Sequence, residues 1–327
     1  MNPKQLRRQV ARLFHRPGLR TTRVGIEHEL VAAEIDTGAP VPTERVREAT
    51  RNGEYAAYLG FEPGGQVELS LPCTPGPTAA RQLRMAVSAV RADCERAGIR
   101  LDATPVDSRS GAEVPLQLTS PRYLAMQRHF DSIGPAGRTM MRRTASTQLC
   151  LDWWPGSAGL EQWRLLNLAG PLLAAGFARS AGPESRLATW LGVDPGRTAF
   201  DGRLLRGDDP VAAYADFAAR ATVFTTPGDV AQHLTTLFPP VRPRSTYLEV
   251  RFLDVQPLAA IDDLVGAFST LLYDDTCRRE AIRMVGADAA GLGELWARAA
   301  AGCPRLGDRA QELLALARGD RRLGGAA

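Results

Sequence analysis

Four segments of the chain alternate apolar and polar residues with a period of two, which is typical of β-strands with one buried face. In residues 24–31, for example, Glu27 and Glu29 share one face, opposite the apolar Ile26 and Leu30. The polar faces carry Glu27 and Glu29 in residues 24–31, Glu68 in residues 66–71, Gln148, Cys150 and Asp152 in residues 144–152, and Glu249 and Arg251 in residues 247–252. Each segment predicts a strand whose other face packs against a core.

Apolar residues at helical spacing predict helices between these strands. Helices are expected over residues 1–20, 78–97, 160–180, 209–222 and 229–237, from residue 121 and beyond residue 258, with Pro171 interrupting the apolar helix that contains it. Long helical excursions between alternating strands favour an antiparallel or mixed sheet with one open face, and hence an α+β fold. Because neither a repeat nor a linker stands out, we expect one domain over residues 1–327, with a helical extension from about residue 258.

Two connections hold further candidate residues. Residues 62–65, Glu-Pro-Gly-Gly, predict a turn into the second strand. Its glycines either let backbone amides approach a ligand or serve an ordinary tight turn. A predicted loop with glycine and proline carries Arg186 and Arg197. These arginines either are simply exposed at the surface or bind a substrate. His28 lies on an apolar strand face, so we expect a core histidine rather than a ligand.

The four polar strand faces indicate a functional site only if they lie together in the fold. Each one alone is typical of a solvated strand face, and Glu249 with Arg251 could be a simple surface pair. On one concave surface, however, several carboxylates would repel one another and need cations between them. This arrangement predicts a site for several magnesium ions, whose usual companion is a nucleoside triphosphate.

The composition excludes several classes of protein. A chain of 327 residues with 44% hydrophobic and 23% charged residues is typical of a globular protein, and no apolar run is long enough to span a bilayer. The net charge of +4 is scattered without a basic stripe, so we expect neither a nucleic-acid nor a membrane partner. The five cysteines lack CxxC spacing, which disfavours a disulfide framework or zinc site and fits a cytoplasmic location.

Lysine usage restricts the chemistry further. Lys4 is the only lysine, so a P-loop lysine, a Schiff-base lysine and a kinase-type strand lysine are excluded unless Lys4 supplies them. Any phosphate that the protein handles must therefore be neutralised by metal ions and arginine.

Several blocks resemble the glutamate–cysteine ligase superfamily, most closely its actinobacterial, ergothioneine-pathway type. The most specific blocks are Glu-Pro-Gly-Gly at residues 62–65 and His-Leu-Thr-Thr-Leu-Phe-Pro-Pro at residues 233–240. The other blocks are residues 24–29, 66–70, 140–148, 241–244 and 248–251, Pro121-Arg122-Tyr123 with Met126, and Arg186 with Trp190, Asp194 and Arg197. The resemblance runs in order over roughly residues 20–275.

This resemblance implies both a fold and a reaction. The fold would be a curved, mostly antiparallel sheet similar to that of glutamine synthetase, with an open concave face for the active site and helices on the other face. The reaction would join the γ-carboxylate of glutamate to an amine such as that of cysteine, through a γ-glutamyl phosphate. ATP and Mg²⁺ would be required.

The resemblance also assigns roles to residues. It implies metal binding by five glutamates: Glu27, Glu29, Glu62, Glu68 and Glu249. Gln148 would contact the metal or the nucleotide, and Arg251 the phosphates, which makes Glu249 and Arg251 the expected catalytic residues. Arg186 would hold a substrate carboxylate, and Arg197 and Cys150 are further candidates for substrate binding.

The chain departs from the family pattern in two places. Where the family strand typically reads Gln-x-Asn, this chain has Gln148 and Cys150, and the segment between Thr226 and Asp229 is much shorter than usual. Both changes concern the acceptor side. They leave two alternatives open: a specialised ligase that joins a different amine in secondary metabolism, and a catalytically silent relative that binds ATP or metal.

Overall fold

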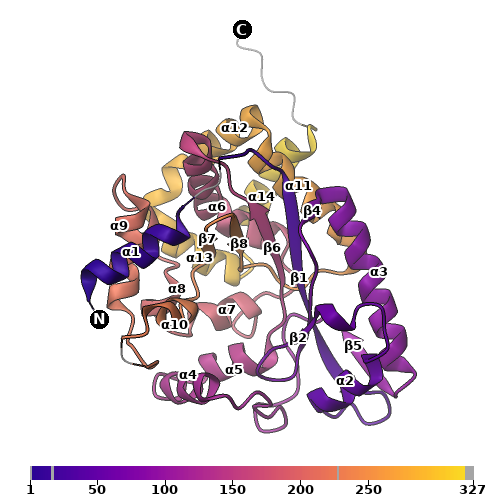
Figure 1. Ribbon diagram of the computed structural model, residues 1–327. Helices are drawn as coiled ribbons and strands as arrows, with labels where there is room; N and C mark the ends of the chain where they lie inside the picture. Colours follow the sequence, from indigo (N-terminus) through magenta and orange to yellow (C-terminus); the bar gives the residue numbers. More distant parts are fainter. Residues whose placement is uncertain (1, 16–17, 227, 321–327) are drawn as a thin grey trace.

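The computed structural model describes residues 2–15, 18–226 and 228–320 (Figure 1). Residue 227, within the shortened segment, lies outside these ranges. The described strands are β1 (Arg23–Glu34), β2 (Leu59–Phe61), β3 (Val67–Ser70), β4 (Thr74–Pro75), β5 (Ile99–Asp102), β6 (Thr147–Asp152), β7 (Val241–Arg244) and β8 (Tyr247–Val250). All four strands that the alternating patterns predict are therefore present.

The strands form one open antiparallel sheet in the order β2-β3-β1-β6-β8-β7, and β4 and β5 pair with β1 outside this path. The strand register decides which polar side chains become neighbours. Glu29 lies opposite Glu68, and on the other side of β1 Glu27 lies opposite Gln148. Further along, Glu249 of β8 lies opposite Cys150. The predicted α+β fold with an antiparallel sheet is confirmed.

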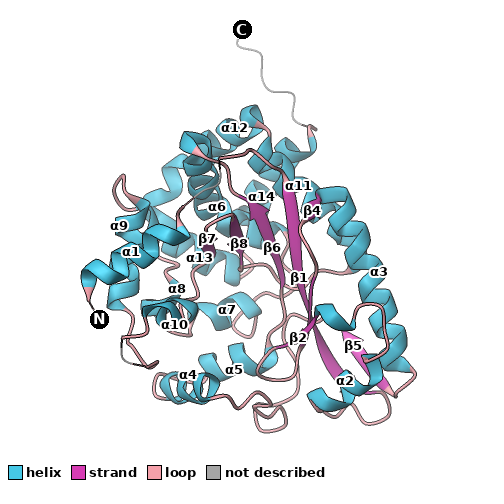
Figure 2. Ribbon diagram, in the orientation of Figure 1, coloured by secondary structure: helices cyan, strands magenta, loops and turns pink. Residues whose placement is uncertain are grey.

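Helices surround the sheet (Figure 2). They are α1 (Pro3–Leu13), α2 (Thr43–Thr50), α3 (Gly76–Glu95), α4 (Pro121–Asp131), α5 (Ala136–Arg143), α6 (Gly156–Gly176), α7 (Arg186–Leu191), α8 (Pro195–Thr198), α9 (Pro210–Arg220), α10 (Val230–Thr235), α11 (Ile261–Tyr273), α12 (Asp275–Val285), α13 (Leu292–Ala300) and α14 (Pro304–Arg318). Four short 3-10 turns complete the described elements: η1 (Ala56–Tyr58), η2 (Arg203–Leu205), η3 (Leu258–Ala260) and η4 (Gly286–Gly291). None of the helices in the described ranges combines the length and apolarity that crossing a membrane requires.

The apolar strand faces lie in a continuous core with α3, α6 and α11. Ile26 and Leu30 of β1 are buried there, and His28 between them is fully buried as well. The Nδ1 atom of His28 lies 3.0 Å from Oγ1 of Thr147, and burial lowers the pKa of this imidazole to about 3. His28 is therefore a neutral core histidine, as its position on the apolar face predicts.

The structure corrects three expectations about local structure. Pro171 does not interrupt α6, because the buried packing of this helix outweighs the one backbone hydrogen bond that a proline removes. The loop expected around Arg186 and Arg197 forms the short helices α7 and α8, in which both arginines are buried. The alternating patterns did not predict β7, because its Pro243 disfavours a strand. This proline is tolerated because β7 lies at the edge of the sheet.

Candidate active site

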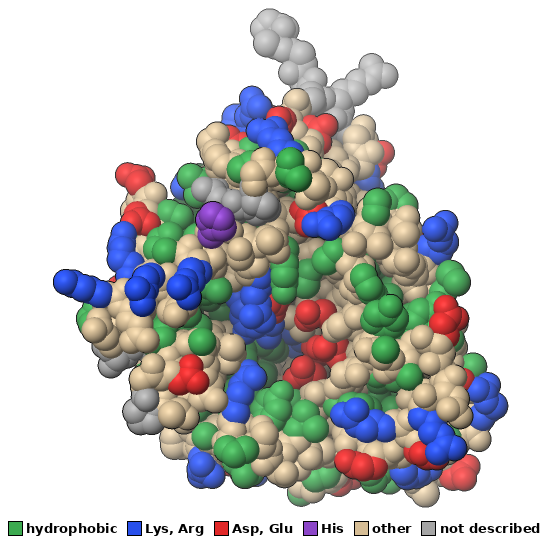
Figure 3. Space-filling model, in the orientation of Figure 1, with side chains coloured by type: hydrophobic (Ala, Val, Ile, Leu, Met, Phe, Trp, Pro, Cys, Tyr) green, Lys and Arg blue, Asp and Glu red, His purple; other side chains and the backbone are tan. Residues whose placement is uncertain are grey.

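A cavity of about 240 Å³ opens on the polar face of the sheet. In Figure 3, acidic side chains line one side of the central hollow and basic side chains the other. We call these the acidic wall, made of Glu27, Glu29, Glu62 and Glu68, and the arginine wall, made of Arg242, Arg244 and Arg251 around Glu249. A third side, the apolar wall, is lined by Tyr123, Met126, Met140, Met141, Trp190 and Phe238.

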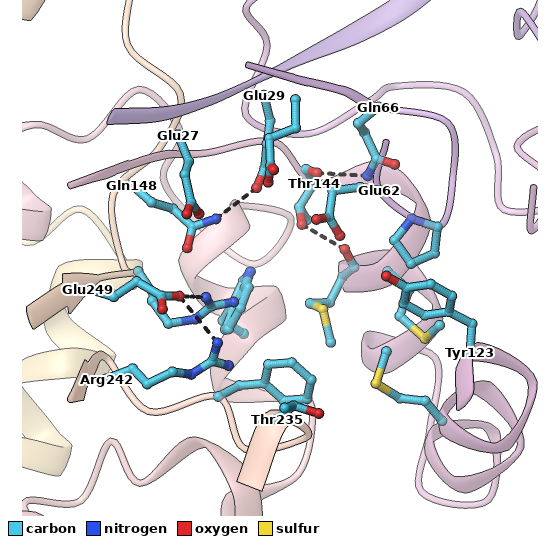
Figure 4. Close-up of a pocket in the computed structure, with 18 of the residues that line it drawn as sticks. Glu27, Glu29, Glu62, Gln66, Tyr123, Thr144, Gln148, Thr235, Arg242 and Glu249 are labelled. Atoms are coloured by element: carbon cyan, nitrogen blue, oxygen red, sulfur yellow. Dashed lines mark hydrogen bonds and ion pairs between the residues drawn. The ribbon is translucent and has the colours of Figure 1, made fainter. Parts of the chain in front are cut away.

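The acidic wall gathers carboxylates from three parts of the chain. Glu27 and Glu29 project from β1, Glu68 from β3, and Glu62 from the turn between β2 and β3. One oxygen each of Glu29, Glu62 and Glu68 lies within 4.8 Å of the other two, a spacing that a single cation can bridge. Figure 4 shows Glu27, Glu29 and Glu62 directed toward one space.

These carboxylates destabilise one another's charge. Burial, followed by repulsion from Glu29 and Glu68, raises the pKa of Glu62 to about 8. Burial is also the largest cause of the raised pKa values of Glu27, Glu29 and Glu68, and neighbouring carboxylates add to the shift of Glu27 and Glu68. Because a bound cation would favour the ionised forms, the electrostatics of this wall suit a metal site.

Glu29 is held in place by hydrogen bonds. The backbone N–H and the hydroxyl of Ser146 donate to its two oxygens at 2.7 and 2.9 Å, and Nε2 of Gln148 donates to one of them at 3.0 Å. Gln148 is thereby oriented with its own Oε1 buried and without a hydrogen-bond partner in the described residues. An unpaired buried carbonyl beside three carboxylates completes a set of hard oxygen donors, which Mg²⁺ prefers.

The arginine wall is held together by Glu249, which is only 2% exposed. Arg244 Nε donates to one of its carboxylate oxygens at 2.8 Å, and Arg242 Nη1 lies 3.3 Å from the other, to which Arg251 also donates. Burial, followed by repulsion from Arg242, lowers the pKa of Arg251 to about 9, while the acidic wall opposes this shift. Both oxygens of Glu249 thus pair with arginines in this structure, and the expected role of Glu249 as a metal ligand stays a prediction.

Arg186 lies between the arginine and apolar walls. Its Nη2 donates to the backbone carbonyl of Arg251 at 3.0 Å, and its guanidinium carbon lies 5.0 Å from the ring centre of Trp190. Its Nε and Nη1 are buried without partners in the described residues. A buried guanidinium with two unused donors at a cavity suits a carboxylate ligand.

The Glu-Pro-Gly-Gly turn serves packing. Gly65 has a φ of 90°, and a side chain at Gly64 would meet the backbone of Arg142 at 2.2 Å. The N–H of Gly64 donates to Oε1 of Gln66, and that of Gly65 to the carbonyl of Glu62. Since both amides are used within the turn, the alternative of an ordinary tight turn fits better than backbone amides open to a ligand.

Two predicted site residues lie outside the cavity lining. Cys150 is on the same sheet face, with Sγ 3.8 Å from Oε1 of Glu27, and burial raises its pKa well above the ordinary value of 9.0. Arg197 is fully buried, donates to the Thr236 hydroxyl at 2.8 Å and lies 4.1 Å from the ring centre of Phe224. The donors of Arg197 hold α8 and the neighbouring loops together, so direct substrate binding does not fit its position.

Several lining residues were missed by reasoning from the sequence. Arg242 and Arg244 occupy alternate positions on β7, a signal that the intervening Pro243 concealed. The methionines of the apolar wall lie in blocks that resemble the family, but no role at the site was expected for them.

Comparisons with known proteins find relatives of this chain. The family model described as glutamate-cysteine ligase family 2 matches residues 23–301. The chain is 34% identical over 268 residues to glutamate–cysteine ligase EgtA of Mycolicibacterium smegmatis, an alignment covering 68% of this chain and 62% of that protein. It is 32% identical over 308 residues to the same-named protein of Mycobacterium tuberculosis H37Rv, covering 77% and 68%. The chain thus spans about two thirds of the length of these relatives.

A solved structure shows a related fold. The bifunctional glutathione synthetase of Pasteurella multocida aligns with 98% of this chain and 49% of its own, with a TM-score of 0.51 and 14% sequence identity. At this identity the likeness concerns the fold alone.

Proposed function

The chain belongs to the glutamate–cysteine ligase family 2, and on that premise we propose that it joins the γ-carboxylate of glutamate to the amine of cysteine at the expense of ATP. The observation that carries the proposal is the pairing of an acidic wall with an arginine wall across one cavity. Such a pair can hold a metal–triphosphate complex from both sides, because cations bind the carboxylates and arginines bind the phosphate oxygens. It also fits a chain whose only lysine, Lys4, lies in α1.

Glu29, Glu62 and Glu68, with Glu27 and Gln148 beside them, would hold magnesium. Their donor atoms are all oxygens, and the unpaired Oε1 of Gln148 supports a ligand at this point. When bound, the metal would neutralise charge on the phosphates of ATP during phosphoryl transfer. Glu249 lines the same cavity and would be a further metal ligand, as the resemblance implies, on the side where its oxygens now pair with arginines.

The remaining residues would position the substrates. Arg186 would bind a carboxylate of glutamate, and Arg251 and its neighbours on the arginine wall would bind the phosphates. The γ-carboxylate attacks the γ-phosphorus of ATP and yields γ-glutamyl phosphate and ADP. The acceptor amine then attacks the acyl carbon, phosphate leaves, and the amine loses a proton. Fixed arginines favour this path because they are already oriented where negative charge increases.

We further propose that the described chain acts as one catalytic domain. The main hydrophobic core includes residues from Leu6 in α1 to Ala317 in α14, so the helical extension beyond residue 258 shares the core of the sheet. The domain would require only small-molecule substrates.

The test is a direct assay of the ligation. The protein is mixed with ATP, magnesium, glutamate and a panel of amines, and phosphate release and new amide are measured. The proposal expects both products with cysteine. Phosphate release without amide for every amine would contradict the second half-reaction, and silence with all amines would contradict the whole proposal.

One observation favours a second candidate, a ligase of this family with a different acceptor. Cys150, where the family pattern has an amide, lies against Glu27 at the edge of the acidic wall. An uncharged thiol offers a weaker donor than an amide and changes what can bind there. A preference for cysteine over all other amines by orders of magnitude would reject this candidate.

A further inference from the structure

Two cysteines meet over a glycine of β1 at the edge of the acidic wall. Cys150 of β6 lies directly opposite Gly25 in the sheet. On the other side of β1, Cys73 immediately precedes β4, whose Thr74 pairs with Val24, the neighbour of Gly25 (Figure 1). Gly25 therefore lies between the two cysteines, and both thiols are free in this structure.

The distances across Gly25 are short. A Cβ atom placed on Gly25 would lie 2.8 Å from Sγ of Cys73 and 3.2 Å from Cβ of Cys150. Opposed Cβ atoms in a sheet are usually about 5 Å apart, so the side chains on this face are drawn together. Sγ of Cys73 thus lies at most about 6 Å from Cβ of Cys150, and a disulfide holds its two Cβ atoms about 3.8 Å apart. Because Gly25 has no side chain, a small shift of Cys73 would close the remaining gap.

The two thiols differ in their access to solvent. Cys73 is exposed, in residues 71–73 that join β3 to β4, whereas Cys150 is buried. The strand β4 has only two residues, and the N–H of Leu71 donates to the carbonyl of Ile26 over a long 3.4 Å, so a shift of this connection disrupts little regular structure. An exposed thiol with a buried partner beside it suits thiol–disulfide exchange, in which the first thiol attacks and the second one resolves the mixed disulfide.

We propose that Cys73 and Cys150 form a reversible disulfide over Gly25 by exchange with a small disulfide such as cystine. Sγ of Cys73 attacks one sulfur of cystine, the S–S bond of cystine breaks, and one cysteine leaves with the proton of the Cys73 thiol. Sγ of Cys150 then attacks Sγ of Cys73, the mixed disulfide breaks, and the second cysteine leaves with the proton of Cys150. The protein loses two hydrogen atoms, and cystine is reduced to two cysteines. Transient disulfides of this kind also form in reducing compartments.

The bridge would change the surroundings of one carboxylate of the acidic wall. Sγ of Cys150 lies 3.8 Å from Oε1 of Glu27, and a disulfide has no S–H to donate to that oxygen. The inference goes beyond the proposed function and rests on it only for the identity of the small disulfide, since cystine is the oxidised form of the proposed acceptor.

The test maps the thiols by mass spectrometry and needs neither ATP nor activity. Cys303→Ser serves as the background, because Cys303 is the remaining cysteine that is not buried. With cystine, the background protein should lose the mass of two hydrogen atoms and yield a peptide that links Cys73 to Cys150, and dithiothreitol should reverse both changes. Adding Cys150→Ser should stop the reaction at a stable cysteinyl adduct on Cys73. Adding Cys73→Ser should prevent any reaction at Cys150.

The matched control is Cys277→Ser in the same background, which removes a buried thiol on α12 rather than on the sheet. This variant should form the bridge as the background does, and Cys150→Ala repeats the resolving test if serine disturbs the fold. A lasting adduct on Cys73 in the background protein, a bridge between any other pair of cysteines, or no reaction at Cys73 would overturn the inference. A failed ligation assay would leave this mapping unchanged, so the two proposals fail separately.

Discussion

The two charged walls of the cavity are built on opposite electrostatic principles. Among the described residues, none of the four carboxylates of the acidic wall has a salt bridge to a cationic side chain. Glu249 of the arginine wall has three such partners, Arg242, Arg244 and Arg251. We therefore propose that a cation from outside the chain completes the acidic wall. The arginine wall is already assembled by its own residues.

This difference predicts where stability resides. A buried charge with partners strongly destabilises the fold when one partner is removed, because the other charges remain buried and unpaired. Carboxylates that repel one another oppose folding until a cation arrives. Variants of the arginine wall should thus lower stability, and variants of the acidic wall should raise the stability of the metal-free protein.

The largest effect is expected at the arginine wall. Glu249→Gln would remove the carboxylate that pairs directly with Arg242, Arg244 and Arg251 and lower the free energy of unfolding by roughly 3–5 kcal/mol, measured by urea denaturation. The control Glu294→Gln removes an exposed partner of Arg298 and should cost about 0.5 kcal/mol or less. Equal effects in the two variants would show that the arginine wall does not depend on Glu249.

Magnesium should stabilise the protein through the acidic wall. At a concentration 100-fold above its dissociation constant, it would raise the free energy of unfolding by about 2.7 kcal/mol, seen as a higher melting temperature. A variant with Glu29, Glu62 and Glu68 all changed to glutamine should lose this shift, because it lacks the oxygens within bridging distance. Conversion of three exposed glutamates, Glu44, Glu48 and Glu54, to glutamine is the matched control. A shift that survives in the acidic-wall variant would place the metal elsewhere.

In the absence of metal, the stability of the protein should depend on pH through the acidic wall. The pKa of Glu62 is raised from 4.5 to about 8, so the folded chain keeps a proton that the unfolded chain has already released. Stability is then lost as pH rises from about 4.5 through about 8. Glu62→Gln cannot lose stability in this way. As pH rises through this window, the variant should therefore become more stable relative to the parent protein by roughly 1–3 kcal/mol. A difference that stays constant with pH would contradict the raised pKa.

The acidic wall was the more predictable half of the site. Glu27, Glu29 and Glu68 lie on strands with a clear period of two, and that period alone determines which face each side chain occupies. Glu62 lies in the predicted turn that leads into β3, and the family resemblance alone grouped it with the other carboxylates. The period of a strand is a local property, which a sequence carries directly.

The arginine wall was less predictable because it depends on pairing across strands. The partners of Glu249 are set by the register of β7 against β8, and Pro243 hid β7. Arg197 was expected in a loop, yet it is buried by contacts with Asp194, Thr236 and Phe224 that come together only in the folded chain. Burial of an arginine depends on such distant partners, and no local pattern reveals them.

The smallest predicted effect is the energetic coupling between the acidic wall and the arginine wall. Arg251 belongs to the arginine wall, but its charge is favoured by Glu27, Glu62 and Glu29 of the acidic wall. A double-mutant cycle of Glu27→Gln and Arg251→Gln should give a favourable coupling of about 0.5–1 kcal/mol without metal. Magnesium should reduce this coupling, because a bound cation replaces Arg251 as the counter-charge of Glu27.

The control for this coupling is a cycle of Glu27→Gln with Arg197→Gln. Arg197 lies outside the cavity lining and is not among the groups that shift the pKa of Glu27, so its coupling should be about 0.3 kcal/mol or less. Equal couplings in the two cycles would mean that the interaction of Arg251 with Glu27 is not specific. A coupling between Glu27 and Arg251 that magnesium leaves unchanged would mean that the cation does not act at the acidic wall, since a charge bound there must weaken the attraction of Glu27 for the arginine.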